Sequence, residues 1–182
     1  MCQLCETQPV YEFTNKRKVC ARCFINYFQK KFLYTLKKFG MIKRGEVIGY
    51  KVGKNFRDVV LEDVLNMFGD KSFVEVVKLP SRNVNVVAVS DTIDVNSFEI
   101  INDLIKGKAK LEKVKPVEKK IIKPLYLFLD EEVLLYAKLK GLKFVKKVDK
   151  NDKINNFIEE LEKKHPEVKR AVINSYLELY NL

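Results

Sequence analysis

The chain has 182 residues, of which 47% are hydrophobic, and a formal net charge of +11. This length allows one domain, or a small domain with an appendage, and the apolar fraction excludes a wholly disordered chain. No run approaches the roughly 18 to 20 consecutive apolar residues of a membrane span. The first residues lack the charged and apolar regions of a secretory signal. We therefore expect a cytoplasmic protein.

The positive charge is concentrated in two stretches. Residues 1–44 hold ten Lys or Arg and two Glu, a net charge of +8, and residues 106–123 hold eight Lys and two Glu, a net charge of +6. The remaining 120 residues carry a net charge of −3. Such concentration indicates a surface that binds a polyanion such as nucleic acid, although Lys-rich sequences also spread charge over solvated faces.

All four cysteines lie within the first 23 residues, as two Cys-x2-Cys pairs separated by fourteen residues: Cys2, Cys5, Cys20 and Cys23. Two residues between cysteines let both sulfurs turn toward one ion, and two such knuckles complete a tetrahedron of thiolates around zinc. An iron–sulfur cluster also uses four thiolates, whereas disulfides are disfavoured in a reducing cytoplasm. We predict a structural zinc site on a short hairpin that turns near residues 14–18.

A basic helix is predicted directly after the second knuckle. Apolar residues recur every three or four positions from Phe24 to Phe39, and Gly40 is placed to end the helix. This stripe indicates a core or partner interface rather than base stacking. The basic residues of the knuckles and the helix are candidates to bind the phosphates of nucleic acid. They are Lys16, Arg17, Lys18, Arg22, Lys30, Lys31, Lys37 and Lys38.

The rest of the chain alternates predicted strands and helices. Strands are expected at residues 46–52, 72–79 and 84–89, and helices at residues 58–68, from Asp94 or Asn96 to Ile105, at 130–140, within 154–164 and from 166 to 180. This alternation predicts an α/β fold with a parallel sheet covered by helices. Residues 106–123 are too charged for a core element and are expected to form an exposed connector. Its lysines are further candidates for nucleic-acid contacts, namely Lys106, Lys108, Lys110, Lys113 and Lys115.

The catalytic constellations of common enzyme classes are missing. The only histidine is His165, at a predicted helix junction, and no cysteine follows residue 23. The sequence lacks the Gly-x4-Gly-Lys-Ser/Thr phosphate loop and the Gly-x-Gly-x2-Gly fingerprint. The loop after the first strand of the alternating region holds one glycine, Gly53. Phe56 is bulky at a place where a phosphate-binding loop needs exposed backbone N–H groups.

The ordered motifs resemble those of the tRNA 2-thiolation proteins built on the PP-loop ATPase fold, which make 2-thiouridine at the wobble position. Members open with two metal-binding pairs, a Pro-Val step between them and a long helix beginning with Phe. The chain matches this order with its four cysteines, Pro9-Val10 and Phe24, and later with Lys123-Pro124-Leu125 and Glu132-Val133-x2-Tyr136-Ala137. The resemblance implies a metal module and basic helix over residues 1–44. A PP-loop (adenine nucleotide alpha hydrolase-like) domain, with helices on both faces of its parallel sheet, would follow over residues 45–182.

Departures from the family pattern indicate a chain without catalysis. The Ser-Gly-Gly-Lys-Asp-Ser loop that binds ATP in active members is here the degenerate run Gly53-Lys54-Asn55-Phe56-Arg57-Asp58, and Ser90 replaces the family's histidine. The elements that carry the family's later cysteines are missing between about residues 79 and 84. The chain therefore resembles a reduced, non-catalytic subunit of the cytoplasmic tRNA 2-thiolation protein 2 type.

From this resemblance we expect a subunit that forms a heterodimer with a catalytic PP-loop thiolation subunit and helps to hold tRNA. Two alternatives stay open. One is a shortened PP-loop enzyme that still binds ATP through Gly53, Lys54 and Asp58 and adenylates tRNA. The other is a free-standing zinc-containing nucleic-acid-binding factor. Nucleotide binding would indicate the first alternative, and copurification with a PP-loop protein would argue against the second.

Overall fold

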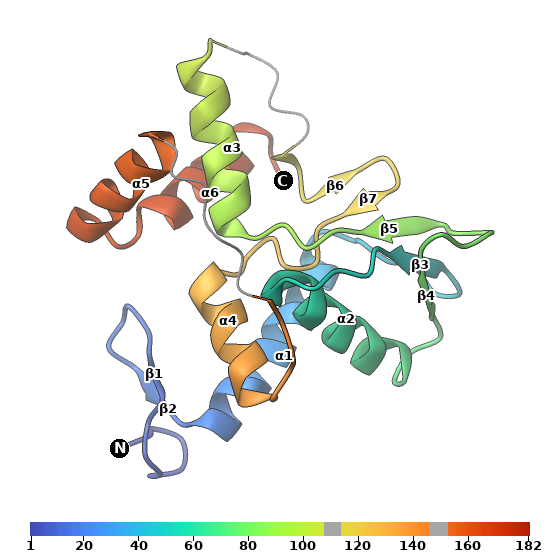
Figure 1. Ribbon diagram of the computed structural model, residues 1–182, viewed down its shortest axis with the longest axis horizontal. Helices are drawn as coiled ribbons and strands as arrows, with labels where there is room; N and C mark the ends of the chain where they lie inside the picture. Colours follow the sequence, from blue (N-terminus) through green and yellow to red (C-terminus); the bar gives the residue numbers. More distant parts are fainter. Residues whose placement is uncertain (108–113, 146–152) are drawn as a thin grey trace.

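The computed structural model describes residues 1–107, 114–145 and 153–182, in which a small hairpin precedes an α/β domain (Figure 1). The elements in chain order are β1 (Tyr11–Glu12), β2 (Lys18–Val19), α1 (Ala21–Lys38), β3 (Val47–Tyr50), α2 (Phe56–Gly69), β4 (Glu75–Lys78), β5 (Val86–Ala88), α3 (Ile93–Ile105), β6 (Val117–Glu118), β7 (Ile121–Ile122), α4 (Asp130–Leu139), α5 (Lys153–Lys164) and α6 (Val168–Leu179).

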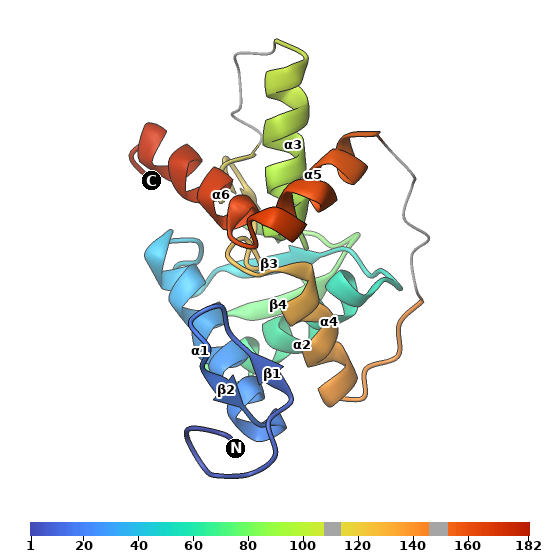
Figure 2. The same ribbon diagram turned by 90° about the vertical axis from the view of Figure 1, so that its left-hand side faces the viewer.

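Five strands form one mixed sheet in the order β4-β3-β5-β7-β6. The pairs β3 with β4, β3 with β5 and β5 with β7 are parallel, and only β6 runs antiparallel to its neighbour. Helices α1, α2 and α4 lie on one side of the sheet, and α3, α5 and α6 lie on the other (Figure 2). The predicted α/β class, a largely parallel sheet with helices on both faces, is confirmed.

The connection between β4 and β5 is unusually short. Both strands are parallel to β3 and lie on opposite sides of it, yet only residues 79–85 join them. A parallel crossover normally needs a dozen or more residues and often contains a helix. Here the link passes close to Gly49 of β3, where an added Cβ would lie 2.8 Å from side-chain atoms of both Leu79 and Val84. The missing side chain at Gly49 thus makes room for the link, which coincides with the expected deletion.

The apolar stripe of α1 packs into the main core, as predicted. Phe28 stacks on Tyr136 of α4 with a ring-centroid distance of 4.2 Å and contacts Phe128 at 4.4 Å. The same core continues through β3 and α2. The division of the chain at residue 44 stays a prediction. A second core forms between α3 and α6, from Ile93, Ile100, Tyr126, Ile173, Tyr176 and Leu177 among others.

The expected exposed connector at residues 106–123 is wrong at its C-terminal end, although Lys106, Lys119 and Lys120 are exposed as expected. Strands β6 and β7 join the sheet, and Lys123 is 4% exposed. Its ammonium can be buried because Asp91 lies 3.1 Å away and the Asn96 side-chain oxygen accepts a hydrogen bond at 2.7 Å. The charge of this stretch is therefore neutralised by the fold at its C-terminal end.

The start of α3 also differs from the expectation. Thr92, and neither Asp94 nor Asn96, is the N-cap residue. Asp94 lies in the first turn, where a carboxylate is stabilised by the helix dipole. No helix within the described ranges is long and apolar enough to cross a bilayer.

Candidate metal centre and nucleic-acid interface

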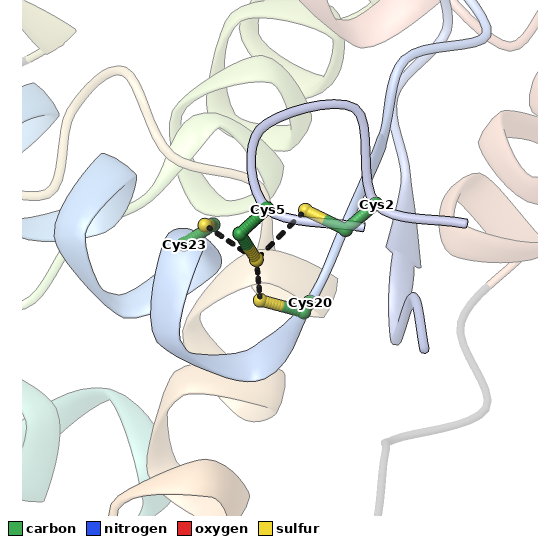
Figure 3. Close-up of side chains that lie close together, drawn as sticks. All are labelled: Cys2, Cys5, Cys20 and Cys23. Atoms are coloured by element: carbon green, nitrogen blue, oxygen red, sulfur yellow. Dashed lines mark hydrogen bonds between the residues drawn. The ribbon is translucent and has the colours of Figure 1, made fainter. Parts of the chain in front are cut away.

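The four cysteines converge at the N-terminal end of α1 (Figure 3). The Cys5 sulfur lies 3.7 Å from that of Cys2, 3.3 Å from that of Cys20 and 3.7 Å from that of Cys23, and all four sulfurs lie within 4.8 Å of one another. The antiparallel pairing of β1 with β2 returns the chain from the first knuckle to the second. These four residues could hold a metal.

The sulfur spacing suits a single ion. A tetrahedral zinc site with Zn–S bonds of about 2.3 Å places its sulfurs about 3.8 Å apart. In a four-iron cluster each thiolate binds a different iron, so the sulfurs are spread more widely. The separations of 3.3 to 3.7 Å around Cys5 agree with the arrangement around one ion.

The thiols differ in how readily they lose their protons. Hydrogen bonds from the Thr7 hydroxyl and the Cys23 backbone N–H lower the pKa of Cys20 to about 6. The hydrogen bond to Cys20 raises the pKa of Cys23 to about 12, because it favours the thiol there. A metal ion would displace the remaining protons. An ion held by all four thiolates would keep no open position for a substrate and would therefore stabilise the fold.

Six of the eight basic candidates on the module and α1 are exposed: Lys16, Lys18, Arg22, Lys30, Lys37 and Lys38. Lys16 and Lys18 lie 3.9 and 3.4 Å from carboxylate oxygens of Glu12. The other four have no carboxylate partner among the described residues. They are therefore available to phosphates.

Arg17 and Lys31 are held against aromatic rings instead. The Arg17 guanidinium lies 4.8 Å from the ring centroid of Phe13 and 5.9 Å from that of Tyr27. The Lys31 ammonium lies 4.6 Å from the ring centroid of Phe128. Both side chains have limited exposure, and only Arg17 lacks a carboxylate partner within the described part of the chain.

Lys31 does not present its charge at the surface. Its side chain is 12% exposed, and its ammonium lies 2.7 and 2.9 Å from the two oxygens of Glu132, which is fully buried. Burial lowers the pKa of Lys31, and the Glu132 carboxylate opposes that shift. Arg170 of α6 adds a third charge 3.6 Å from Glu132. The pair thus joins α1 to α4, and Lys31 is not available to nucleic acid in this structure.

The second basic stretch is described only at its ends. Lys106 is exposed after α3, and the Lys115 ammonium lies 5.3 Å from the ring centroid of Tyr180. Lys108, Lys110 and Lys113 lie outside the described residues.

The loop after β3 is closed by its own side chains. The Asp58 carboxylate turns back onto Gly53, where an added Cβ would lie 1.8 Å from Asp58 Oδ2. The Ser90 hydroxyl donates a hydrogen bond to Asp58 Oδ1 at 2.5 Å, and the Asn55 amide donates one to Oδ2. Asn55 also caps α2 by accepting the Asp58 backbone N–H at 3.0 Å.

This loop occupies the crevice where α/β folds bind ligands, at the carboxyl ends of β3 and β5, whose connections leave in different directions. Lys54 is exposed, and its carbonyl accepts the Val145 N–H at 2.7 Å. Phe56 packs edge-on to Phe144 with a centroid distance of 6.3 Å. The residues of the degenerate loop therefore bind one another and the segment after α4.

A second ionic network beside the loop was not anticipated. Arg57 donates two hydrogen bonds to the Asp130 carboxylate, which also accepts one from the Thr92 hydroxyl at 2.7 Å. The Asp130 N–H and the Lys169 ammonium both donate to Asp94 at 2.7 Å. Burial and the nearby Asp130 charge raise the pKa of Asp94. These residues come from separate helices and a loop, so no local sequence signal could have grouped them.

No protein-family model and no curated protein matches the chain. Among solved structures, the U34-tRNA thiolase NcsA from Methanococcus maripaludis, solved with its [4Fe-4S] cluster, is similar, with a TM-score of 0.79. The two chains are 17% identical, and the similarity covers 98% of this chain and 86% of that chain. At this identity the likeness establishes the fold. It agrees with the PP-loop architecture that the motifs imply.

Proposed function

We propose that the chain is a non-catalytic subunit of a cytoplasmic tRNA wobble-uridine 2-thiolation complex. In that complex it would form a heterodimer with a catalytic PP-loop subunit and help to hold the tRNA that receives 2-thiouridine. The fold likeness to a U34-tRNA thiolase supports the reaction context. The observation that carries the proposal is the loop after β3, which the Asp58 carboxylate fills.

The closed loop argues against nucleotide binding on physical grounds. A phosphate at this place would meet the negative charge of Asp58. The donors that could bind it, the Ser90 hydroxyl and the Asn55 amide, are already used by that carboxylate. A nucleotide would have to break these bonds, and Asp58 is half-buried, so its carboxylate would lose partners that water only partly replaces.

The exposed cations of the metal module and α1 support the RNA-binding part. Arg22, Lys30, Lys37 and Lys38 are exposed and have no carboxylate partner among the described residues. Each phosphate contact made by such a cation releases counterions, so tRNA affinity should fall steeply as salt rises. Binding that changed little between about 50 and 200 mM salt would contradict this part.

For the four cysteines we propose one structural zinc ion, because the sulfur spacing suits a single tetrahedral centre. Elemental analysis of the purified chain should give one zinc per chain. Finding iron with inorganic sulfide would contradict the zinc assignment. It would not affect the proposed non-catalytic role, which the nucleotide titration tests separately.

The deciding test is a titration of the purified chain with Mg-ATP in which calorimetry measures binding. We expect no binding, and tight binding would overturn the non-catalytic role in favour of a shortened ATP-dependent enzyme. A pull-down from the native source, read by mass spectrometry, should recover a PP-loop protein. A chain that binds tRNA yet recovers no such protein would be a free-standing zinc-containing factor.

A matched variant tests the tRNA surface. The triple substitution Lys30→Ala, Lys37→Ala and Lys38→Ala should weaken tRNA binding while the chain stays folded. Lys31 is left in place because it neutralises the buried Glu132. A triple variant that bound tRNA like the parent chain would show that this face is not the contact surface.

A further inference from the structure

A hollow of about 550 Å³ lies between the first knuckle and the outward face of α1. Its size falls within the range of about 300 to 1,000 Å³ of pockets that hold small molecules. The residues that matter for its chemistry are Leu4, Arg17, Asn26, Tyr27, Lys30 and Tyr34. They come from the first knuckle, the hairpin and one face of a single helix, so metal binding and the helix together shape the hollow.

Tyr34 is the feature that the core does not explain. Its side chain is 58% exposed, whereas the opposite face of α1 buries Phe24, Phe28 and Phe32. Residues three and four positions apart are neighbours on a helix. Tyr34 therefore has a lysine at each of its four neighbouring positions, namely Lys30, Lys31, Lys37 and Lys38. Three of these lysines, Lys30, Lys37 and Lys38, are exposed beside the aromatic ring, whereas Lys31 is paired with Glu132.

The hollow has the electrostatics of an anion site. None of the described residues that line it is acidic. Lys30 is exposed, and neither its ammonium nor the Arg17 guanidinium has a carboxylate partner in the described part of the chain. Contacts with Phe13 and Tyr27 hold Arg17 in place, so little conformational entropy would be lost when it binds a phosphate.

The metal site does not account for all of these cations. Four thiolates around a zinc ion leave two negative charges, and Cys23 lines one end of the hollow. Tyr34 lies eleven residues further along α1, which is about 16 Å along the helix axis. Because charges are screened over about 8 Å at physiological salt, Lys37 and Lys38, which lie beyond Tyr34 on the helix, are too distant to serve only as counter-charges to the thiolates.

We propose that this hollow binds one unstacked nucleotide of an unpaired RNA segment, with the base against the Tyr34 ring and the phosphate between Lys30 and Arg17. The inference rests on the proposed function, since it specifies which part of an RNA the module takes. A base in a duplex has both faces covered, whereas an unpaired base can stack on an aromatic side chain. The Asn26 amide offers hydrogen bonds to a base edge.

The test uses the full-length, metal-loaded chain and fluorescence anisotropy with three probes. These are a single-stranded uridine hexanucleotide, an abasic strand of the same length, and tRNA. Stacking on an aromatic side chain contributes about 1 to 3 kcal/mol per base. Tyr34→Ala should therefore weaken hexanucleotide binding about 5- to 150-fold, leave abasic binding unchanged and leave the salt dependence unchanged. Tyr34→Phe, which keeps the ring, should behave as the parent chain.

Two further variants serve as a second test of Tyr34 and as a control. Tyr34→Leu keeps apolar bulk without an aromatic face and should bind like Tyr34→Ala, so the test survives if one of them folds poorly. Phe73→Ala is the matched control, because Phe73 is 75% exposed and lies 4.5 Å from the Arg44 guanidinium but is not part of the hollow. It should leave the affinity for all three probes unchanged.

The outcomes separate the two proposals. If Tyr34→Ala binds the hexanucleotide as the parent chain does, or loses abasic and hexanucleotide binding equally, the inference about the hollow is wrong. If tRNA binding is nevertheless lost in the variant with Lys30, Lys37 and Lys38 changed to alanine, the proposed function stands. If the parent chain binds neither tRNA nor the hexanucleotide, both proposals fail.

Discussion

Two polar regions of this chain sit at helix N-termini and behave in opposite ways. At the start of α1 the four thiols converge on one point and share only weak S–H hydrogen bonds, and cations around them face solvent. At the start of α2 the Asp58 carboxylate, the Asn55 amide and the Ser90 hydroxyl satisfy one another. A polar cluster can serve as a binding site only when its partners come from outside the chain. The knuckles meet this condition, and the loop after β3 does not.

The largest effect is expected from a substitution among the four cysteines at the start of α1. Cys5 has the sulfurs of all three other cysteines as neighbours, so Cys5→Ser should abolish stoichiometric metal binding. Structural zinc sites are worth about 10 to 16 kcal/mol in small zinc-binding peptides, so the hairpin should lose its fold and the melting temperature should drop. Elemental analysis and circular dichroism would measure both. Removing metal from the parent chain with a strong chelator should give the same change, and a metal-loaded Cys5→Ser chain of normal stability would rule out a four-thiolate site.

The next largest effect concerns Lys31, which lies on α1 but is paired with the buried Glu132. Glu132→Gln would leave the Lys31 charge buried without a carboxylate, and breaking such a pair costs about 3 to 5 kcal/mol. Urea unfolding should show this loss. The matched control is Glu131→Gln, because Glu131 is exposed and only accepts the Tyr11 hydroxyl at 2.8 Å. Equal effects of the two substitutions would contradict the assignment of Lys31 to the interior.

A smaller effect is expected from removing the Asp58 carboxylate in the loop after β3. Asp58→Ala would leave the Ser90 hydroxyl and the Asn55 amide without their acceptor, and unsatisfied groups of this kind cost about 1 to 3 kcal/mol. Asp70→Ala, at the exposed end of the same helix, should change stability by less than about 0.5 kcal/mol. Urea unfolding compares the two. If Asp58→Ala were as stable as Asp70→Ala, the hydrogen bonds to Asp58 would not be holding the loop.

The smallest effect is the difference between paired and unpaired lysines on the hairpin and α1. Lys37 and Lys38 have no carboxylate partner in the described chain, whereas Lys16 and Lys18 share Glu12. Changing Lys37 and Lys38 to alanine should reduce the slope of log affinity for tRNA against log salt by about 1 for each lysine that contacts a phosphate. Changing Lys16 and Lys18 should reduce it less. A larger change from the second pair would place the RNA on the hairpin rather than on the helix.

Local patterns were enough to predict much of the fold. The spacing of Phe24, Phe28 and Phe32 predicted the buried face of α1, and alternating strand and helix patterns predicted a parallel sheet covered by helices. The connector was predicted wrongly because its charge is neutralised by residues distant in sequence. Lys123 is buried only because Asp91, from the segment between β5 and α3, and Asn96, from the first turns of α3, lie beside its ammonium.

Tyr34 is a residue that the apolar stripe does not predict. The stripe marks the buried face of α1, and Tyr34 lies on the other side of the helix. The available signal was its position, since lysines stand three and four residues away in both directions. That pattern places a ring among lysines on any helix, but the hollow also needs Leu4 of the first knuckle and Arg17 of the hairpin, which line it together with Tyr34.

The sequence by itself determined which residues could hold a metal, because two residues between cysteines let both sulfurs turn toward one point whatever the rest of the fold does. It also determined the helical face of α1 and the absence of a standard phosphate loop, which are local properties. Only the tertiary structure decided which charges are free. Lys30 and Lys31 are adjacent in sequence, yet one faces solvent and the other is paired with Glu132 from a helix a hundred residues away. The concentrated positive charge of the first 44 residues is therefore exposed to solvent at some positions and paired inside the fold at others.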